Sequence, residues 1–395
     1  YVLQAFLGQG AFGFLLSART RDTHERVTLK FMRKAKMSPE MMTEDDQGVA
    51  VPREFEMLRR CAKYEYILDY VDHHQTDVYW ILVTKLFGVP WDKATAAQTS
   101  ETAMDLPQLV ATPAERQEFS LQREQAAAAA ASVRPAAAAA DAESAKPVQH
   151  QGVAALFEHG CMTRPVSHDL FECIDAHIQQ PATTGANGLP PYLARYVFAQ
   201  VALAVGYLHQ RNIFHRDIKD ENCLVDAMYR VRLIDFGSVT ELPYGENNVQ
   251  FTDFVGTMTY APPQAVLHEP FLPAKNETWA LGVLLYTMVF GCNPFASTEE
   301  ALRGLRHIPD PDGIVDADLR SLLKGCLRVD EKQRYGITEI LTSPWLYAQA
   351  RALDPNGLVM RRFPARAGST RRRQMVKSAT EATEPANGLA LAAEL

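Results

Sequence analysis

The chain has 395 residues, of which 47% are hydrophobic, and a formal net charge of −7 at pH 7. This length exceeds that of a usual single domain, and the apolar content is sufficient for a large core. The acidic balance gives no reason to expect a nucleic-acid partner, because such partners usually go with an excess of basic residues. No membrane partner is expected either, since the longest apolar stretch, residues 279–290, is too short to span a bilayer.

Cysteine usage indicates a reducing compartment. The six cysteines are scattered without a Cys-x-x-Cys pair, so neither a zinc site nor a disulfide framework is indicated. Disulfides are rare where thiols are kept reduced, and we therefore expect a cytoplasmic location. The short basic run at residues 371–373 has three interpretations: a nuclear-targeting signal, an inhibitory pseudosubstrate or a plain solvated extension. The first would add a nuclear location to the cytoplasmic one.

A glycine-rich turn lies near the start of the chain. Residues 1–6, 12–18 and 27–32 are predicted to be strands, the last two joined by a turn at residues 21–24. A dinucleotide site needs a helix after its glycines, so strands on both sides favour a hairpin that covers phosphates. Glycine has no side chain to block the backbone amides, which is why we place phosphate contacts at Gly8, Gln9, Gly10 and Gly13.

The second strand of this hairpin carries Lys30, 17 residues after Gly13, and a helix is predicted from about residue 52. Glu54 is the expected partner of Lys30, because it shares a helix face with apolar residues three and four positions later. Glu56 is expected to face solvent. The alternatives are a solvated edge lysine and two ordinary surface glutamates.

A biased segment follows the strand at residues 79–84. Its alanine runs, residues 126–131 and 136–140, lie among polar residues. Such a segment has no apolar face to bury, so we expect residues 89–165 to be a disordered insertion, with a partner-docking element as the alternative. After it, residues 190–211 have apolar side chains at helical spacing, which predicts a long helix.

The run HRDIKDEN at residues 215–222 follows that helix, and the sequence DFG begins at Asp235, 18 positions after Asp217. Each residue type has a separate part in moving a γ-phosphoryl group: a carboxylate accepts a hydroxyl proton, a cation lies nearby, and two oxygen ligands bind magnesium. The order and spacing match the protein-kinase signature.

The chain therefore resembles a protein kinase from residue 1 to about residue 348, apart from the insertion. Lys219, two positions after Asp217, is typical of serine/threonine kinases. Finer detail in residues 169–177, 204–208 and 233–238 is similar to the PAS-domain-regulated kinases of the calcium/calmodulin-dependent group. The resemblance implies an α+β, bilobal fold, with a small antiparallel β-sheet lobe and one helix in residues 1–88. It implies a mainly helical lobe in residues 166–348 and a sensor domain outside this sequence. Residues 349–395, basic and then alanine-rich, are expected to form a disordered tail.

The resemblance also implies the cofactors ATP and Mg²⁺, protein substrates with Ser or Thr acceptors, and specific site residues. Asp217 would orient and deprotonate the acceptor hydroxyl, and Lys219 would offset charge on the transferred group. Asn222 and Asp235 would bind magnesium. Lys30, held by Glu54, would orient the phosphates. The gatekeeper would be Thr84 and the hinge residues 85–87, and the adenine contacts would include Leu15, Leu86 and Leu224.

Substrate preference and regulation are further expectations. Asp169 and Glu221 match positions where basophilic kinases place carboxylates against a substrate arginine, although both could be solvated charges. Thr257 matches the threonine beside the catalytic aspartate. Thr252 could be phosphorylated and read by Arg216, or could be a plain loop threonine. The tail sequence RAGS, ending at Ser369, has the shape of a self-phosphorylation site.

Three departures from the family pattern leave two functional classes open. Gln264 replaces the glutamate expected to anchor the activation loop to an arginine, plausibly Arg334, so a charge-assisted bond becomes a weaker one. Thr28 and Leu15 alter the adenine pocket, and Glu277 replaces an aspartate. An active kinase is favoured because every catalytic group is kept; the alternative is a catalytically weak kinase-fold scaffold that acts by binding nucleotide or partners.

Overall fold

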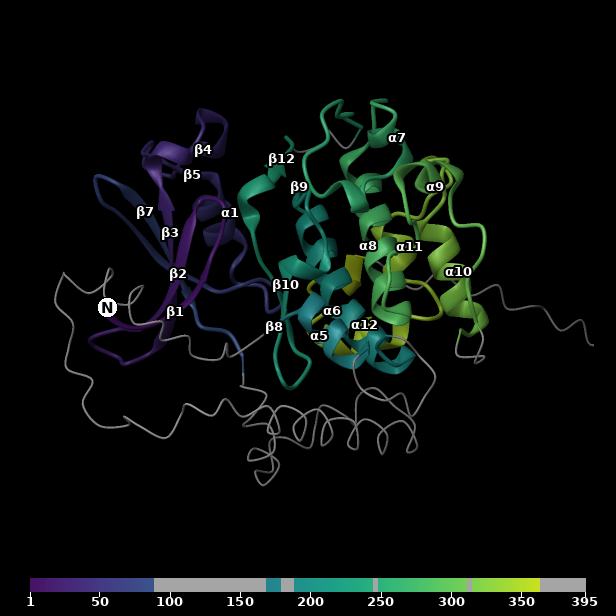
Figure 1. Ribbon diagram of the computed structural model, residues 1–395, viewed down its shortest axis with the longest axis horizontal. Helices are drawn as coiled ribbons and strands as arrows, with labels where there is room; N and C mark the ends of the chain where they lie inside the picture. The colour runs from purple at the N-terminus through teal and green to yellow at the C-terminus, as the bar shows by residue number, and fades with distance from the viewer. Residues whose placement is uncertain (89–167, 179–187, 244–247, 311–314, 363–395) are drawn as a thin grey trace, which may run out of the picture. The chain divides into compact units, whose positions relative to one another are not determined.

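A computed structural model describes residues 1–88, 168–178, 188–243, 248–310 and 315–362 (Figure 1). All of them belong to one compact unit, Tyr1–Pro364. The predicted insertion at residues 89–165 and the predicted phosphosite Ser369 lie outside the described residues. Within the part that is described, no helix is both long and apolar enough to cross a membrane.

The first lobe is built on an antiparallel sheet of five strands, in the order β1-β2-β3-β7-β6. The strands are β1 (Val2–Gln9), β2 (Gly13–Arg19), β3 (Arg26–Arg33), β6 (Tyr70–Gln75) and β7 (Tyr79–Lys85). Alternate residues point to one face, and Ala18, Val27, Leu29 and Val83 bury there as a small apolar cluster. The predicted glycine-turn hairpin is confirmed.

One helix, α1 (Arg53–Cys61), covers this lobe, as predicted. It is preceded by two 3-10 turns, Lys34–Lys36 and Pro39–Met41, and by a hairpin of β4 (Met42–Glu44) and β5 (Ala50–Pro52) that the sequence did not predict. The expectation that Glu56 faces solvent is wrong. Its residue is only 6% exposed, because Arg59 donates to both of its carboxylate oxygens across the helix surface.

The second lobe is mainly helical, which confirms the α+β class. Its helices are α5 (Leu170–Ile178), α6 (Pro191–His209), α7 (Pro263–Val266), α8 (Pro273–Phe290), α9 (Thr298–Arg303), α10 (Ala317–Cys326), α11 (Ile337–Leu341) and α12 (Tyr347–Leu353). The predicted central helix is α6, which is buried along almost its whole length. The predicted helix at residues 279–290 begins earlier, at Pro273, since proline fits the first turn of a helix.

Short strands and turns frame the catalytic run. The strands β9 (Ile213–Phe214) and β12 (Thr240–Glu241) pair with each other, and β10 (Cys223–Val225) lies between β11 (Val231–Leu233) and β8 (His168–Asp169). The 3-10 turns in this lobe are Asp220–Asn222, Phe236–Ser238, Met258–Tyr260 and Met360–Arg362. Residues 215–222 and 235–237 therefore both begin just after a short strand.

The helical lobe extends past residue 348, where the sequence placed its end. Helix α12 runs to Leu353, and the carboxylate of Asp354 accepts the backbone N–H groups of Leu358, Val359 and Met360. Val359 is fully buried, and its carbonyl accepts a hydrogen bond from Gln210, the residue that follows α6. Packing against α6 thus carries the lobe to residue 362.

Candidate active site

A cavity of about 320 Å³ lies between the sheet and the helical lobe, a volume within the range of small-molecule sites. Its lining comprises Leu7, Leu15, Thr28, Lys30, Glu54, Leu58, Leu68, Leu82, Thr84, Lys85, Leu86, Phe87, Asn222, Leu224, Ile234 and Asp235. Seven of these lining residues are leucines, and the Lys30 ammonium group lies within 3.8 Å of the carboxylates of both Glu54 and Asp235. A largely apolar cavity with one such charged cluster suits a planar base joined to phosphates.

The structure brings most of the predicted nucleotide residues to this cavity. Leu15, Leu86 and Leu224 line it together with the predicted gatekeeper Thr84. The backbone N–H of Leu86 donates to the carbonyl of Arg26, so we expect this residue to contribute apolar contact.

Lining residues that sequence reasoning missed are Leu7, Leu58, Leu68, Leu82 and Ile234. Strand periodicity could have found Leu82, because it lies two positions before Thr84 and so on the same face of β7. The same rule pairs Thr28 with Lys30 on β3. Helical spacing could likewise have found Leu58, four positions after Glu54 on α1, whereas Leu68 comes from a loop and has no comparable signal.

The predicted phosphate contacts lie at the turn between β1 and β2, beside the cavity lining: Gly8 and Gln9 end β1, Gly10 is in the turn, and Gly13 begins β2. The turn is closed by a hydrogen bond of 2.9 Å from the N–H of Gly10 to the carbonyl of Gly13. A side chain at Gly13 would place its Cβ 1.7 Å from the Phe31 carbonyl oxygen of β3, so glycine is required there. A Cβ on Gly8 or Gly10 would meet open space, which leaves room above the turn.

The predicted ion pair between Lys30 and Glu54 is present. Lys30 Nζ lies 2.6 Å from Glu54 Oε1 and 3.8 Å from Asp235 Oδ1. Burial would lower the pKa of Lys30, but the attraction of Glu54 and then Asp235 outweighs it and raises that pKa. Burial likewise opposes ionisation of Asp235, and Lys30 and His215 reverse the effect, so the pKa of Asp235 is lowered. Lys30 stays a cation and Asp235 a carboxylate.

The catalytic run holds Asp217 between three neighbours. Its Oδ1 accepts hydrogen bonds from the backbone N–H and hydroxyl of Thr257, at 3.0 and 2.9 Å. Its Oδ2 accepts from Asn222 Nδ2 at 3.0 Å and lies 3.3 Å from Lys219 Nζ. Lys219 also donates to the Thr257 hydroxyl at 2.9 Å. The predicted residues Asp217, Lys219, Asn222 and Thr257 therefore form one network.

Two loop conformations support this network. Arg216 and Asp235 have φ values of 69° and 63°, in the left-handed region that non-glycine residues rarely adopt. The Arg216 N–H donates to Glu277 Oε1 at 2.7 Å, and Glu277 Oε2 lies 2.6 Å from His209 Nε2. Glu277 is 1% exposed, so its longer side chain still reaches the loop where an aspartate was expected. Sequence gave no signal for His209, which lies 68 residues away from Glu277.

His215 packs and bonds inside the core, as expected. It is fully buried, its Nε2 lies 2.9 Å from the Ile234 carbonyl oxygen, and its ring meets Phe236 edge-on with centroids 5.0 Å apart. This contact joins the catalytic run to the DFG sequence.

The activation segment is anchored at its far end as predicted. Arg334 Nη2 donates to Gln264 Oε1 at 2.7 Å, and Arg334 also donates to the carbonyls of Lys275, Arg328 and Val329. The anchor is therefore kept, with an amide in place of a carboxylate.

Thr252 lies in this segment and is exposed. The guanidinium of Arg216 donates to the carbonyl of Asp253, at 3.0 Å, and lies over the Phe251 ring. Arg216 therefore contacts the residues directly before and after Thr252. Phosphorylation of Thr252 stays a prediction.

The two predicted substrate carboxylates lie in an acidic group. Burial raises the pKa of Asp169, and the charges of Glu172, Asp220 and Glu221 raise it further against a hydrogen bond from the Glu172 N–H. Glu221 is 59% exposed at its side chain and pairs with Lys219 at 2.9 Å. A cation placed here would relieve the mutual repulsion of these groups.

Asn222 and Asp235 are the predicted magnesium ligands. The amide nitrogen of Asn222 donates twice to Asp217, which leaves its Oδ1 as the acceptor that faces other groups. Among the described residues, no group of three His, Cys, Asp or Glu side chains could hold a metal by itself. Magnesium commonly takes one or two protein oxygens and completes its shell with phosphates and water, so this donor set fits the ion bound with a nucleotide.

Comparison with known families agrees with this geometry. The protein kinase domain matches residues 139–346, which is more than half of the chain. The chain therefore belongs to the protein kinase family.

Similar proteins are serine/threonine kinases. The PAS domain-containing serine/threonine-protein kinase of Mus musculus is 38% identical over 180 residues, 45% of this chain and 12% of that protein. The serine/threonine-protein kinase prk-2 of Caenorhabditis elegans is 36% identical, over 47% of this chain and 41% of its own length. The kinase PSK2 of Saccharomyces cerevisiae is 40% identical, over 39% of this chain and 13% of its own length. The aligned part is thus less than half of each relative.

Proposed function

We propose that this chain is an active protein serine/threonine kinase, which transfers the γ-phosphoryl group of Mg-ATP to serine or threonine in protein substrates. The observation that carries the proposal is the short Lys30–Glu54 ion pair, 2.6 Å long, with Asp235 within 3.8 Å of the same ammonium group. Kinase activity requires this lysine, glutamate and aspartate to be in place together.

Mg-ATP, when bound, supplies the phosphoryl group and a divalent cation that offsets its charge. Leu15, Leu86 and Leu224 would contact the adenine, and Lys30 would orient the phosphates. Asn222 and Asp235 would offer oxygen ligands to the cation. The turn at residues 8–13 would cover the phosphates with backbone amides.

Asp217 would orient the acceptor hydroxyl and take its proton. The two hydrogen bonds from Thr257 and the one from Asn222 fix the carboxylate, so that less reorientation is needed during reaction. Lys219, 17% exposed, lies between Asp217 and Glu221, and both raise its pKa against the effect of burial. It would remain a cation and offset charge on the moving phosphoryl group.

We further propose a preference for arginine before the acceptor residue. The acidic group of Asp169, Glu172, Asp220 and Glu221 supports this, since the pKa of Asp169 is raised by burial and by the other carboxylates. A guanidinium binds paired carboxylates in a bidentate way and keeps its charge when partly desolvated.

The test is transfer of labelled phosphate from Mg-ATP to two matched peptides, with arginine or alanine three residues before the serine. We expect more transfer to the arginine peptide and none from the Asp217→Asn variant. Equal transfer to both peptides would overturn the arginine preference alone. No transfer by a folded chain that binds Mg-ATP would overturn the kinase proposal in favour of a scaffold.

A further inference from the structure

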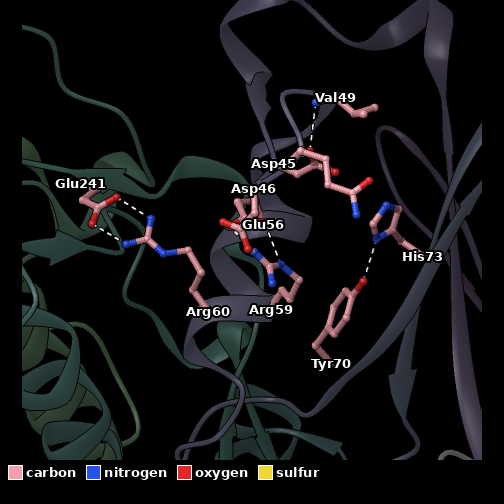
Figure 2. Close-up of polar contacts among 10 residues, drawn as sticks. Asp45, Asp46, Val49, Glu56, Arg59, Arg60, Tyr70, His73 and Glu241 are labelled. Atoms are coloured by element: carbon pink, nitrogen blue, oxygen red, sulfur yellow. Dashed lines mark hydrogen bonds and ion pairs between the residues drawn. The ribbon is translucent and has the colours of Figure 1, made fainter.

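Helix α1 carries two consecutive arginines at its end that bind different parts of the molecule. Figure 2 shows Arg60 directed to Glu241 on one side of the helix, and Arg59 directed to Asp46 and Glu56 on the other. Glu54, the partner of Lys30, lies at the start of the same helix. Contacts at the end of α1 can therefore set the position of Glu54.

The contact between Arg60 and Glu241 is bidentate. Arg60 Nη1 and Nη2 donate to the two carboxylate oxygens of Glu241, each at 2.6 Å. This fork geometry fixes orientation as well as distance. Glu241 belongs to β12 and lies opposite Ile213 of β9, two residues before His215. The contact thus joins α1 to a strand pair in which β9 leads into the catalytic run and β12 follows the DFG sequence.

Arg59 binds different partners from those of Arg60. It donates to Glu56 of its own helix and, at 2.6 Å, to Asp46 in the loop between β4 and β5. All of these groups belong to the sheet lobe. The two neighbouring arginines therefore offer a matched comparison: one ion pair crosses to the helical lobe and the other does not.

Helix α1 has little intrinsic stability. It has nine residues, and Pro52 gives no side-chain cap at its start. Helices of this length are marginal on their own, so tertiary contacts decide where α1 lies. A helix moves nearly as a rigid rod, and a shift at Arg60 would be passed to Glu54.

We propose that Arg60 and Glu241 are positioning residues for the nucleotide, which act by holding α1 where Glu54 binds Lys30. The inference rests on the proposed function, because it assigns Lys30 to the ATP phosphates. The side chains of Arg60 and Glu241 are 39% and 35% exposed, so solvent weakens their attraction. We expect loss of the pair to weaken Mg-ATP binding about threefold, as for a partly exposed ion pair.

The experiment measures the dissociation constant of Mg-ATP by calorimetry on the full 395-residue chain. Arg60→Gln and Glu241→Gln should each raise it about threefold. The two variants change net charge in opposite directions. If net charge alone governed attraction of the ATP anion, Arg60→Gln would raise the dissociation constant and Glu241→Gln would lower it. The exchanged pair, Arg60→Glu with Glu241→Arg, should restore binding.

Two further variants separate positioning from a general structural role. Asp46→Asn removes an ion pair of the same length from Arg59, and it should leave the dissociation constant unchanged. In a Glu54→Gln background, Arg60→Gln should have no added effect, because the route to the nucleotide is already broken.

Unchanged binding in Arg60→Gln, an equal loss in Asp46→Asn, or an added loss in the Glu54→Gln background would each overturn the inference. Failure of the proposed function looks different. If the wild-type chain bound Mg-ATP, responded to Arg60→Gln as expected and transferred no phosphate, the kinase proposal would fail while the positioning role of Arg60 would stand.

Discussion

The activation segment is held by an arginine at both ends, and the two anchors differ in burial and in charge. Near its start, Glu241 binds Arg60, and both side chains are more than one-third exposed. At its far end, Gln264 binds Arg334, which is 2% exposed. The carboxylate lies at the exposed anchor, whereas the acceptors that the described residues offer to Arg334 at the buried anchor are amide and carbonyl oxygens.

Because of this difference, we expect one anchor to affect mainly folding stability and the other to affect mainly the position of α1. A buried cation that loses its acceptors costs several kcal/mol, whereas an exposed ion pair contributes little to folding. Burial lowers the pKa of Arg334 to about 10, and the nearest acidic groups only partly oppose this. We therefore expect the far anchor to dominate folding stability and the near anchor to act mainly on where α1 lies.

Arg334→Ala should give the largest effect. It removes hydrogen bonds to Gln264 and to three backbone carbonyls, together with the contact of the buried guanidinium with the Trp279 ring. We expect the free energy of unfolding to fall by about 3 kcal/mol, measured by denaturant titration. The control is Arg328→Ala, which removes an exposed side chain and should cost less than about 0.5 kcal/mol. Equal losses in the two variants would contradict a dominant buried anchor.

Gln264→Glu should stabilise the fold. A carboxylate would make a charge-assisted bond to Arg334, although it would lose the bond that Gln264 Nε2 makes to the Val329 carbonyl. We expect a net gain of about 1 kcal/mol at pH 7.

The gain should depend on pH with a defined sign. Arg334 would depress the pKa of the new carboxyl in the folded state below the unfolded value of about 4.3, so the gain is full above that pH and is lost as pH falls below it. Unfolding curves at pH 7, 5 and 3.5 check this. A variant no more stable than wild type at pH 7 would show that the amide already satisfies Arg334.

The exposed anchor should give the smallest change in stability. A double-mutant cycle with Arg60→Gln and Glu241→Gln should yield a coupling of about 0.5 kcal/mol in unfolding free energy at low salt. Salt screens exposed charges, so the coupling should shrink at about 1 M salt. A salt-independent coupling as large as the loss in Arg334→Ala would erase the contrast between the two anchors.

Much of the fold and site follows from local sequence. Glycine spacing, strand alternation and the order of Asp217, Asn222 and Asp235 place the sheet, the turn and the catalytic run. The pair of Lys30 with Glu54 could also be predicted, because apolar neighbours at helical spacing orient Glu54.

The parts that could not be predicted depend on residues far apart in the chain. Glu56 is a nearer case: it was expected in solvent, although helical spacing brings it beside Arg59, three positions later. His209 reaches Glu277 across two helices, and Arg60 reaches Glu241 over 181 residues. No periodicity or motif encodes these two pairs. The first forms when α6 and α8 pack within the helical lobe, and the second forms when the two lobes pack.

The most direct test of the central claim is phosphate transfer from Mg-ATP by the wild-type chain and by Lys30→Met, to one peptide made with serine, threonine or tyrosine as acceptor. We predict label on serine and threonine and none on tyrosine, with the Lys30→Met rate at least about 100-fold lower because phosphate orientation is lost. A folded wild-type chain that binds Mg-ATP and transfers no more label than Lys30→Met would contradict the account.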